Sequence, residues 1–545
     1  MKKLIFKKFI IIPALAAVVF LTTTAFKNDF FEIAKQLEIF TTLYKEINMN
    51  YVDDTNPGAL MDTAIKNMLV ELDPYTNFMN EQDVEEARIN NTGDYTGIGA
   101  RVKTMEDKLL IVEPYKDYPA DQAGLKAGDE IIKVGSIAVS SYKEDAGNLL
   151  KGSTGTEVEV TFIRQGKEQT ATIKRAEVEI NAVPYFSMLD SKTGYIVLSQ
   201  FTDKAYSQTN YALRDLKAQG AKRIILDLRG NPGGLLNEAI RIVNLFVPKG
   251  QLIVTTKSKV QKYNRTYYTQ NEPIDIEIPL AILINGNSAS ASEIVSGALQ
   301  DLDRAVIIGS RSFGKGLVQR PKSLPYGTQL KITISRYYTP SGRCIQALDY
   351  WHRNENGEAV RVKQESYNEF KTKNGRKVYD GGGVLPEVIV GPNKKSPITT
   401  ALINNDFVFN FATKYYYSHE IDDLNAFQFT DADFKDFKNY LKAANFSFET
   451  DTEKELDEVY KTAQEENLSD AILKDYNALV EKLKQVKISN IDDDKEFLVK
   501  ALTQEIVKRY GYSEGLYDYY KRHDPAVKKA NDIVSDISVY YDYLR

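Results

Sequence analysis

The sequence predicts a multidomain α/β protein, with a layered α/β core, a β-rich module ahead of it and helical regions at both ends. The first observation is length, because 545 residues exceed what one hydrophobic core organises. The second is that apolar runs of buried-strand length alternate with helical segments between residues 195 and 390, which is typical of a layered α/β core. The third is a change to short alternating strands with glycine turns between residues 93 and 175.

The first 27 residues are typical of an export signal. Lysines cluster at the start, an apolar run follows at residues 9–21, and small residues at 22–25 offer a cleavage site. The apolar run is shorter than the ~20 residues that cross a bilayer comfortably. We therefore expect a cleaved signal peptide, with an uncleaved tether in the inner membrane as the alternative.

Four further regions follow along the chain. Residues 28–91 have apolar positions at helical spacing, interrupted by an Asn-Pro-Gly turn at 56–58, and form an N-terminal helical region. Residues 92–178 form the β-rich module, and residues 179–395 form the α/β core. Residues 396–545 are polar, tyrosine-rich and helical in pattern, and we expect a regulatory or oligomerising domain there.

Regular elements are expected throughout the module and the core. In the module, strands are predicted at 98–102, 109–112, 130–134 and 158–162. In the core, strands are predicted at 195–198, 223–228, 280–284 and 305–308, and helices at 203–219, 235–246 and 290–302. Three of the core strands lead into the segments that carry the chemistry.

Composition argues against several functional classes. The formal net charge is −5 and the sequence pI is about 5.7, which does not favour a nucleic-acid-binding protein. The single cysteine, Cys344, allows neither an intramolecular disulfide nor a thiolate metal cluster. The three histidines are far apart, which argues against a zinc hydrolase and leaves few residues for a Ser-His-Asp site. We expect no metal and no cofactor.

One serine lies where a buried strand is predicted to lead into a helix. The strand ends near Ile284, a turn of small residues follows, and an amphipathic helix begins near Ser290. The unpaired N–H groups and the positive dipole at a helix N-terminus suit the oxyanion of a tetrahedral intermediate. On this segment alone a simple helix cap is the commoner interpretation, and a catalytic serine is the alternative.

A lysine flanked by two glycines follows the next strand, at Lys315. Such a lysine is usually a solvated loop residue. The glycines remove side-chain bulk, so its ammonium can approach another segment of the chain. A lysine acts as a base only when neutral, and its ordinary pKa of about 10.4 falls far enough only in a dry site.

A third segment, residues 226–234, ends a buried strand with a glycine-rich turn and opens another helix. A phosphate-binding turn is one interpretation, although the spacing of a P-loop is absent because no lysine follows. A plain strand-to-helix connection is another. A backbone N–H of this turn could also serve as an oxyanion donor.

Together the three segments resemble the C-terminal processing peptidases, also called tail-specific proteases, which carry LDLRxNxGG, SASASE and FGKGxxQ motifs. The resemblance covers roughly residues 40–392 and implies a crotonase-like layered core. It implies that Ser290 is the nucleophile and that Lys315, 25 positions later, is its general base. By the same match Gln319 orients the lysine amine, and the backbone N–H groups of Gly233 and Ala291 form the oxyanion hole.

The β-rich module resembles a PDZ domain. Residues 95–100 resemble the carboxylate-binding loop of PDZ domains, and residues 124–132 resemble their GLxxGDxI segment. The resemblance implies that a substrate C-terminus adds as a strand beside this loop. The residues that would contact the terminal carboxylate are Gly97, Ile98, Gly99 and Ala100.

The sequence therefore predicts an exported serine endopeptidase, periplasmic in a Gram-negative bacterium, that recognises polypeptides by exposed C-terminal tails. Two alternatives remain: a PDZ scaffold on an inactive core, and an acyl-CoA enzyme, since similar layered cores bind thioesters. Two regions depart from the family pattern, an insertion at about 347–379 and the helical residues 396–545. We expect the latter to bind an adaptor or to build an oligomer.

Overall fold

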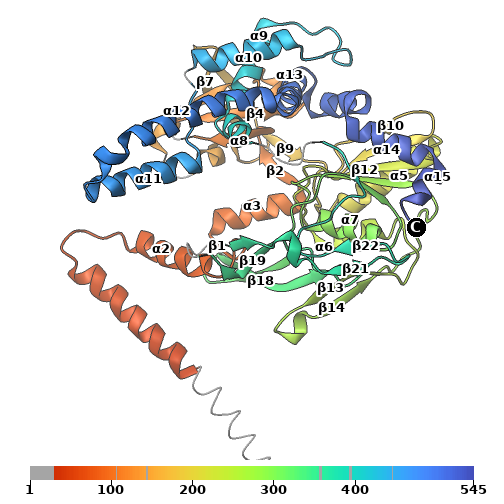
Figure 1. Cartoon of the computed structure of the whole chain (residues 1–545), viewed down its shortest axis with the longest axis horizontal. Coiled ribbons are helices and arrows are strands. Elements are labelled where there is room, and N and C mark those ends of the chain that lie inside the picture. The colour runs from red at the N-terminus through yellow and green to blue at the C-terminus, as the bar shows by residue number, and fades with distance from the viewer. Residues whose placement is uncertain (1–29, 106, 143–144, 355–358, 392–395, 445) are drawn as a thin grey trace, which may run out of the picture. The chain divides into compact units, whose positions relative to one another are not determined.

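The computed structural model describes residues 30–105, 107–142, 145–354, 359–391, 396–444 and 446–545 (Figure 1). The predicted export signal at 1–27 therefore lies outside the described residues. The chain forms two compact units, one with the residues up to Met79 and Pro321–Ile332, the other with Asn80–Arg320 and Thr333–Arg545. Within the described ranges, no helix combines the length and the apolarity that a membrane span requires.

The first unit contains two helices and a short strand. Residues 30–50 form the N-terminal helix, and α2 (Pro57–Val70) follows after a loop. Pro57 occupies the first turn of α2, where its missing N–H is no loss, and the Asn56 side chain caps that turn. β1 (Asn77–Met79) pairs antiparallel with residues 329–331.

A six-stranded sheet organises the second unit. Its order is β10 (Tyr185–Met188), β11 (Thr193–Val197), β12 (Arg223–Asp227), β15 (Leu280–Ile284), β16 (Val306–Gly309) and β23 (Val388–Ile389). All neighbours are parallel except β10 and β11. Parallel neighbours need crossover connections, which here contain α5 (Ala205–Ala218), α6 (Leu236–Val243) and α7 (Ala291–Asp301). The three helices and the strands β11, β12, β15 and β16 lie close to their predicted positions, whereas β10 and β23 were not predicted.

Alternate residues of these strands point into two different hydrophobic cores. Ile224 and Leu226 belong to the core that α5, α6 and α7 cover, whereas Ile225 and Leu283 belong to one that α14 (Pro525–Ser535) and α15 (Ile537–Asp542) cover. Both faces of a parallel sheet are apolar and need cover. α14 and α15 belong to the region 396–545 that the sequence predicts to be helical, and they cover this face of the core sheet (Figure 1).

A second sheet contains β17 (Leu317–Ser323), β18 (Gln329–Tyr338), β13 (Leu252–Lys257) and β14 (Arg265–Tyr268). β13 pairs antiparallel with β14 and with residues 336–338 of β18. β17 follows the loop that carries Lys315 and pairs with β18. This sheet therefore supports one side of the candidate site.

The β-rich module is a small antiparallel sheet in the order β3 (Ala100–Thr104), β4 (Leu109–Pro114), β5 (Glu130–Val134), β7 (Glu157–Arg164) and β8 (Lys167–Lys174). β6 (Ile137–Ala138) pairs with β5, and a short helix, α4 (Pro119–Gln122), follows β4. The chain enters this module through β2 (Asp94–Gly97), which follows α3 (Glu81–Thr92), and leaves it through β9 (Ala176–Glu179). β2 and β9 pair antiparallel. β3 lies at the end of the sheet order, next to the 3-10 turn η2 (Ala146–Leu150).

Four helices of the C-terminal region share an aromatic core: α8 (Pro397–Asn404), α9 (Phe407–Ser418), α10 (Asp431–Ala443) and α13 (Lys495–His523). α11 (Asp451–Glu465) packs on α12 (Ser469–Asp493), where Tyr460 stacks on Tyr476. α13 bends at Tyr512, which has φ 57° and ψ −168°. The Tyr512 hydroxyl bonds Asp121 of α4 (2.6 Å), and Lys116 pairs with Glu514 (3.2 Å). The bend in α13 therefore contacts the β-rich module.

The predicted insertion folds as two hairpins. β19 (Leu348–Arg353) pairs with β20 (Ala359–Arg361), and β21 (Glu369–Lys371) pairs with β22 (Lys377–Tyr379). The turn of the second hairpin is anchored to the core, since Arg376 pairs with Asp303 and Glu387, each at 2.7 Å.

Candidate active site

Ser290 caps the N-terminus of α7 in a strained conformation. Its backbone has φ 55° and ψ −111°, which is rare for a residue with a side chain. The preceding turn is fixed, because the Ser288 hydroxyl donates to the Leu228 carbonyl (2.8 Å). A strained residue at a strand-to-helix turn is held there by its surroundings, and such strain clusters at functional sites.

The glycine-rich turn after β12 contacts Ser290 directly. A Cβ placed on Gly233 would lie 2.8 Å from the Ser290 Cβ and 3.0 Å from the Ala291 nitrogen, and Gly233 has φ 102°. Only glycine fits there without displacement. The structure thus brings together Gly233, Ser290 and Ala291, which the sequence analysis assigned to the nucleophile and the oxyanion hole.

Asn231 joins this turn to the nucleophile segment and was missed by the sequence analysis. It is fully buried, and its carbonyl accepts hydrogen bonds from the Ala289 N–H and the Ser292 hydroxyl, both at 3.0 Å. Its side-chain oxygen accepts the Gly233 N–H at 2.8 Å. The Gly233 amide is therefore engaged by Asn231 in this structure.

Lys315 lies in the loop between β16 and β17. An added Cβ at Gly314 would lie 2.3 Å from the Ala347 Cβ, and the Gly316 N–H donates to the Gln346 Oε1 (2.7 Å). The two glycines therefore let the segment that leads into the insertion pack directly against the lysine loop. Neither contact was evident in the sequence.

Glu293 connects the lysine loop to Ser290. Its carboxylate is fully buried and accepts four hydrogen bonds, at 2.6–2.9 Å. The donors are the backbone N–H groups of Ser290, Gly314 and Lys315 and the hydroxyl of Ser312. Burial raises the pKa of Glu293 to about 7, although the hydrogen bonds oppose that rise. The sequence analysis quoted this glutamate only as part of a motif.

Tyr337 makes a second connection between the same two residues. Its buried hydroxyl lies 2.6 Å from the Lys315 carbonyl oxygen and 3.2 Å from that of Ser290. Glu293 therefore receives the N–H groups of Ser290 and Lys315, and the Tyr337 hydroxyl faces their carbonyls. These four contacts, two to Glu293 and two to Tyr337, hold the backbone at Ser290 close to the backbone at Lys315.

Gln319 lies on β17, four residues after Lys315. Its side-chain nitrogen donates to the Thr333 hydroxyl on β18 (3.1 Å). This contact holds the amide on the second sheet. The role predicted for Gln319 as a partner of the lysine amine stays a prediction.

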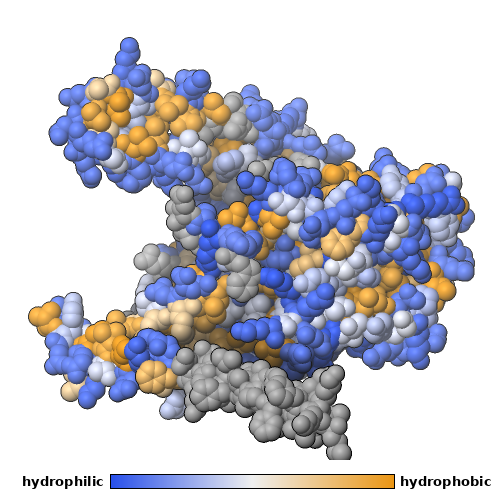
Figure 2. All heavy atoms as spheres, turned by 60° about the horizontal axis from the view of Figure 1, so that its bottom comes forward, coloured by the Kyte–Doolittle hydropathy of each residue, from blue (hydrophilic) through white to orange (hydrophobic). Residues whose placement is uncertain are grey.

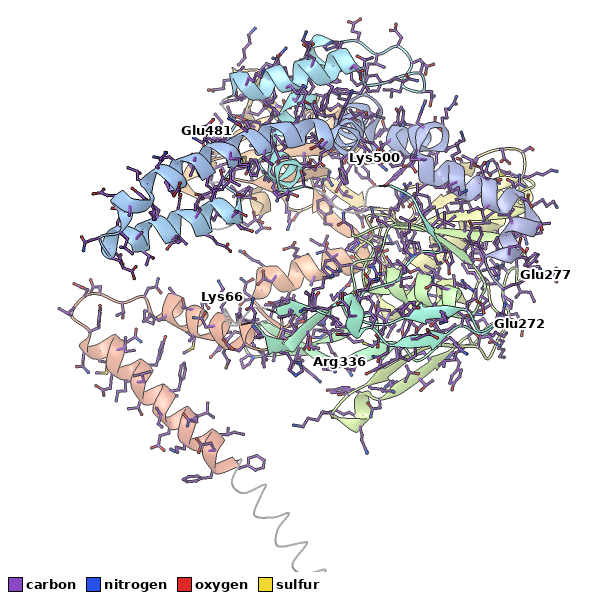
Figure 3. All side chains as sticks on the ribbon, in the orientation of Figure 1. Lys66, Glu272, Glu277, Arg336, Glu481 and Lys500 are labelled. Carbon is purple, nitrogen blue, oxygen red and sulfur yellow. The ribbon has the colours of Figure 1, made fainter. Side chains whose placement is uncertain are left out.

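A buried charged cluster supports the glycine-rich turn from behind. Arg229 pairs with Asp227 (2.7 Å) and with Asp524 (2.9 Å), which caps the N-terminus of α14. Figure 3 labels Lys500 on α13, whose ammonium lies 3.3 Å from Asp524. Burial would raise the pKa of Asp524, but the charges of Arg229 and Lys500 lower it to about 2.

The predicted carboxylate-binding loop connects β2 to the edge strand β3. Gly99 has φ 72°, and a Cβ there would lie 2.4 Å from the Tyr118 Cβ. The carbonyls of Ile98 and Gly99 accept hydrogen bonds from Ala120 (2.7 Å) and Tyr115 (2.9 Å). Hydrogen bonds to the carbonyls of Ile98 and Gly99 thus hold the loop in place, and the loop leads into β3 at the edge of the sheet.

Three family models match separate parts of the chain. They are "Peptidase family S41" at residues 192–349, "PDZ domain" at 96–174 and "Probable PDZ-protease, C-terminal helical domain" at 398–534. A carboxy-terminal-processing protease of Bartonella bacilliformis is 38% identical over 322 residues, which span 58% of this chain and 73% of that relative. The chain belongs to the carboxy-terminal-processing protease family. It is a serine peptidase of family S41 with a PDZ domain, as the sequence predicted.

Other known proteins are similar to parts of this chain. A probable CtpA-like serine protease of Staphylococcus haemolyticus is 34% identical over 306 residues, or 55% of this chain and 61% of that relative. Among solved structures, the photosystem II D1 C-terminal processing protease matches with 27% sequence identity and a TM-score of 0.37, over 64% of this chain and 86% of that chain. The predicted fold class, an α/β peptidase core with a PDZ domain and C-terminal helices, is confirmed.

Proposed function

We propose that this family member is an exported endopeptidase that cleaves polypeptides recognised by their C-terminal tails, with Ser290 as nucleophile and Lys315 as general base. One observation carries the assignment. The segment with Ser290, the candidate nucleophile, and the segment with Lys315, the candidate base, are joined through their shared partners Glu293 and Tyr337. A helix cap or a solvated loop lysine, the two plainer interpretations, would not require such a connection.

The reaction then follows from the chemistry of the two side chains. Neutral Lys315 accepts the hydroxyl proton of Ser290 while the Ser290 oxygen bonds to a peptide carbonyl carbon. The carbonyl oxygen becomes an oxyanion next to the Ala291 N–H, at the positive end of α7. Lys315 passes its proton to the leaving amine, and water then hydrolyses the acyl-enzyme.

Gly233 is the second proposed oxyanion donor. Because its N–H bonds the Asn231 side chain, Gly233 must exchange or share this partner when the oxyanion forms. Gln319 is proposed to orient the lysine amine, which would require its side chain to turn from Thr333. Both roles are carried over from the family motif.

Substrate choice is proposed to reside in the PDZ domain. A C-terminal carboxylate would bind the Gly97–Ala100 loop while the tail extends the sheet beside β3. Export rests on the lysine-led apolar segment at residues 1–27, and we propose a periplasmic location, soluble or tethered. A polypeptide adaptor for the C-terminal helices also remains a proposal.

The decisive experiment compares the parent with Ser290→Ala and Lys315→Ala on an unfolded protein that ends in apolar residues. Both variants should lose at least about 1,000-fold in kcat. Ser207→Ala and Lys222→Ala, at exposed positions of the same core, are the matched controls and should retain activity. Activity in either site variant equal to that of the parent would contradict the assignment.

A further inference from the structure

One β-hairpin of the second sheet is strongly basic. Between residues 239 and 271 the chain has six basic residues and no acidic one, although acidic residues outnumber basic ones over the whole chain, 75 against 70. The hairpin consists of β13, a turn that contains the 3-10 helix η3 (Gln261–Tyr263), and β14. In Figure 1 its two strands extend with this turn at the free end. Four of the cations lie at or beside the turn: Lys257, Lys259, Lys262 and Arg265.

Hydrogen bonds within the hairpin hold the turn in one conformation. The Ser258 N–H donates to the Asn264 side-chain oxygen at 2.6 Å, and the Thr256 hydroxyl donates to the Tyr263 carbonyl at 2.8 Å. The Val260 N–H donates to the Ser258 hydroxyl at 3.1 Å. The cations are therefore presented by a preorganised turn, so that binding there requires little ordering of the backbone.

The four cations are exposed, and none of them forms a salt bridge within the described part of the chain. The Lys257 ammonium lies over the Tyr338 ring, 4.5 Å from its centroid, and that of Lys262 lies 5.2 Å from the centroid of the Tyr263 ring. Lys257 is directly opposite Arg336 of β18, which Figure 3 labels. Like charges in directly opposite positions of a sheet repel each other, and an anion bound between them removes that repulsion. The hairpin is therefore suited to an anionic partner.

The cations surround the turn instead of lining one face. Arg265 is paired with Thr256, whose side chain is buried, so the two lie on the same face of the hairpin. Lys257, the next residue of β13, lies on the opposite face. Lys259 and Lys262 lie in the turn that joins the strands. A groove for one peptide would need its cations on a single face, whereas a flat anionic surface that meets the turn end-on contacts cations of both faces.

The side chains between the cations favour lipid over an acidic polypeptide. Val260 in the turn is 46% exposed and Tyr268 is 49% exposed. Tyrosine rings are favoured at the boundary between membrane and water, and an apolar side chain can enter it. A polypeptide would add as a strand beside β14, which ends the sheet order. β14 has only four residues and begins with a cation, and both features discourage strand addition.

Attraction to a lipid surface must come mainly from charge. Figure 2 brings the lower side of Figure 1 forward and shows more hydrophilic than hydrophobic residues there. Each lysine or arginine held near an anionic bilayer strengthens binding by about 5-fold, and salt screens the effect. Several cations on one rigid turn therefore suffice for reversible binding without a large apolar area.

We propose that the β13–β14 hairpin docks on a surface of anionic phospholipids, with Val260 at the boundary and the four cations among the headgroups. This docking goes beyond the proposed peptidase function and does not depend on the chemistry of Ser290 and Lys315. It holds the protein at a membrane even where residues 1–27 have been removed.

The first test places a probe in the turn itself. In a Cys344→Ser background, which leaves no thiol, Val260→Cys of the full-length chain carries a fluorophore sensitive to polarity. Vesicles of phosphatidylglycerol should shift its emission to the blue, and vesicles of phosphatidylcholine should not. The same label at Lys482→Cys, an exposed position of α12, should respond to neither. An unshifted emission at Val260, or equal shifts at both positions, would overturn the proposal whether or not residues 1–27 bind lipid.

The second test changes the charges of the labelled protein. Replacing the three lysines of the hairpin should raise the lipid concentration at half-maximal shift by about 100-fold. A matched triple at exposed lysines outside the hairpin should leave it unchanged. The two variants are Lys257→Gln with Lys259→Gln and Lys262→Gln, and Lys167→Gln with Lys192→Gln and Lys222→Gln.

Two outcomes of this second test would contradict the proposal. Equal weakening in both triple variants would show that net charge alone decides binding and would refute a role for the hairpin. Polyglutamate that displaces the vesicles from the label at an equal concentration of negative charge would identify an acidic polypeptide as the partner. Addition of about 0.5 M salt to the parent should reduce the shift, as electrostatic docking requires.

Discussion

Ser290 and Lys315 share two partners: the N–H groups of both residues donate to the Glu293 carboxylate, and the carbonyl oxygens of both face the Tyr337 hydroxyl. The positions of the two residues are thus fixed through the main chain, independently of their side chains.

Glu293→Gln should inactivate the enzyme without preventing substrate binding. A glutamine places an NH₂ group against donors that need an acceptor, so the approach of Ser290 and Lys315 is disturbed. We expect kcat to fall by about 100-fold with KM little changed, measured on a peptide substrate. A parallel rise in KM would indicate general damage to the fold.

The pH dependence of the parent enzyme should report on the same carboxyl. Its pKa is about 7 in the folded chain, against 4.5 as its ordinary value. The stabilisation from binding this proton is therefore complete below pH 4.5 and is lost as the pH rises through 7. Activity should change in the opposite sense, because only the ionised carboxylate accepts all four donors. The acid limb of kcat near pH 7 should disappear in Glu293→Gln, and an unchanged limb would assign it to another group.

Tyr337→Phe should lower kcat by about 10-fold, since it removes the hydrogen bond, worth about 1 kcal/mol, between the Tyr337 hydroxyl and the Lys315 carbonyl. Tyr338→Phe, the neighbouring residue on β18, serves as control and should behave like the parent. If both variants keep full activity, the Tyr337 hydroxyl does not position the lysine loop.

Gly233→Ala should be far more harmful than Gly230→Ala, although both glycines lie in one turn and have positive φ. At Gly233 a methyl group would meet the Ser290 Cβ, the Ala289 carbonyl and the Ala291 nitrogen; at Gly230 it would meet nothing within 4 Å. We expect Gly230→Ala to cost about 1 kcal/mol of stability with activity retained. Gly233→Ala should lose at least about 100-fold in kcat, and equal activities would exclude close contact.

Asp524→Asn should destabilise the core. An asparagine can still cap α14, but Arg229 loses one of its two carboxylate partners. The pKa of Asp524 is about 2, below its ordinary 3.8, so its stabilisation is present above pH 3.8 and is lost as the pH falls through 2. At pH 7 the free energy of unfolding should drop by roughly 2–3 kcal/mol, measured by chemical denaturation. The exposed Asp422→Asn is the control, and a difference that persists below pH 2 would contradict the charge argument.

Blocking the substrate C-terminus should weaken recognition. An amidated peptide cannot place a carboxylate on the amides of the Gly97–Ala100 loop, so KM should rise at least about 10-fold with kcat unchanged. Steady-state kinetics on paired free-acid and amidated peptides would measure this. Identical KM values would place recognition outside the PDZ loop.

The candidate catalytic residues could be proposed from sequence because their motifs are local. Ser290 and the 226–234 turn each sit where a predicted strand ends, and the structure places them in contact. Asn231, Glu293 and Tyr337 could not be assigned roles, since hydrogen bonds between residues distant in sequence leave no periodic signal. The same reason hid α14 and α15 among other helices: their amphipathic pattern shows that one face is buried but not which surface covers it.

The position of those two helices bears on when the enzyme can first act. One face of the catalytic sheet stays open until residues 525–542 dock on it, and these residues follow all the strands of that sheet. A growing chain therefore carries Ser290 and Lys315 on an unfinished scaffold, and we expect it to be inert. A ribosome that still holds residues 525–542 would therefore keep the peptidase from cleaving its neighbours.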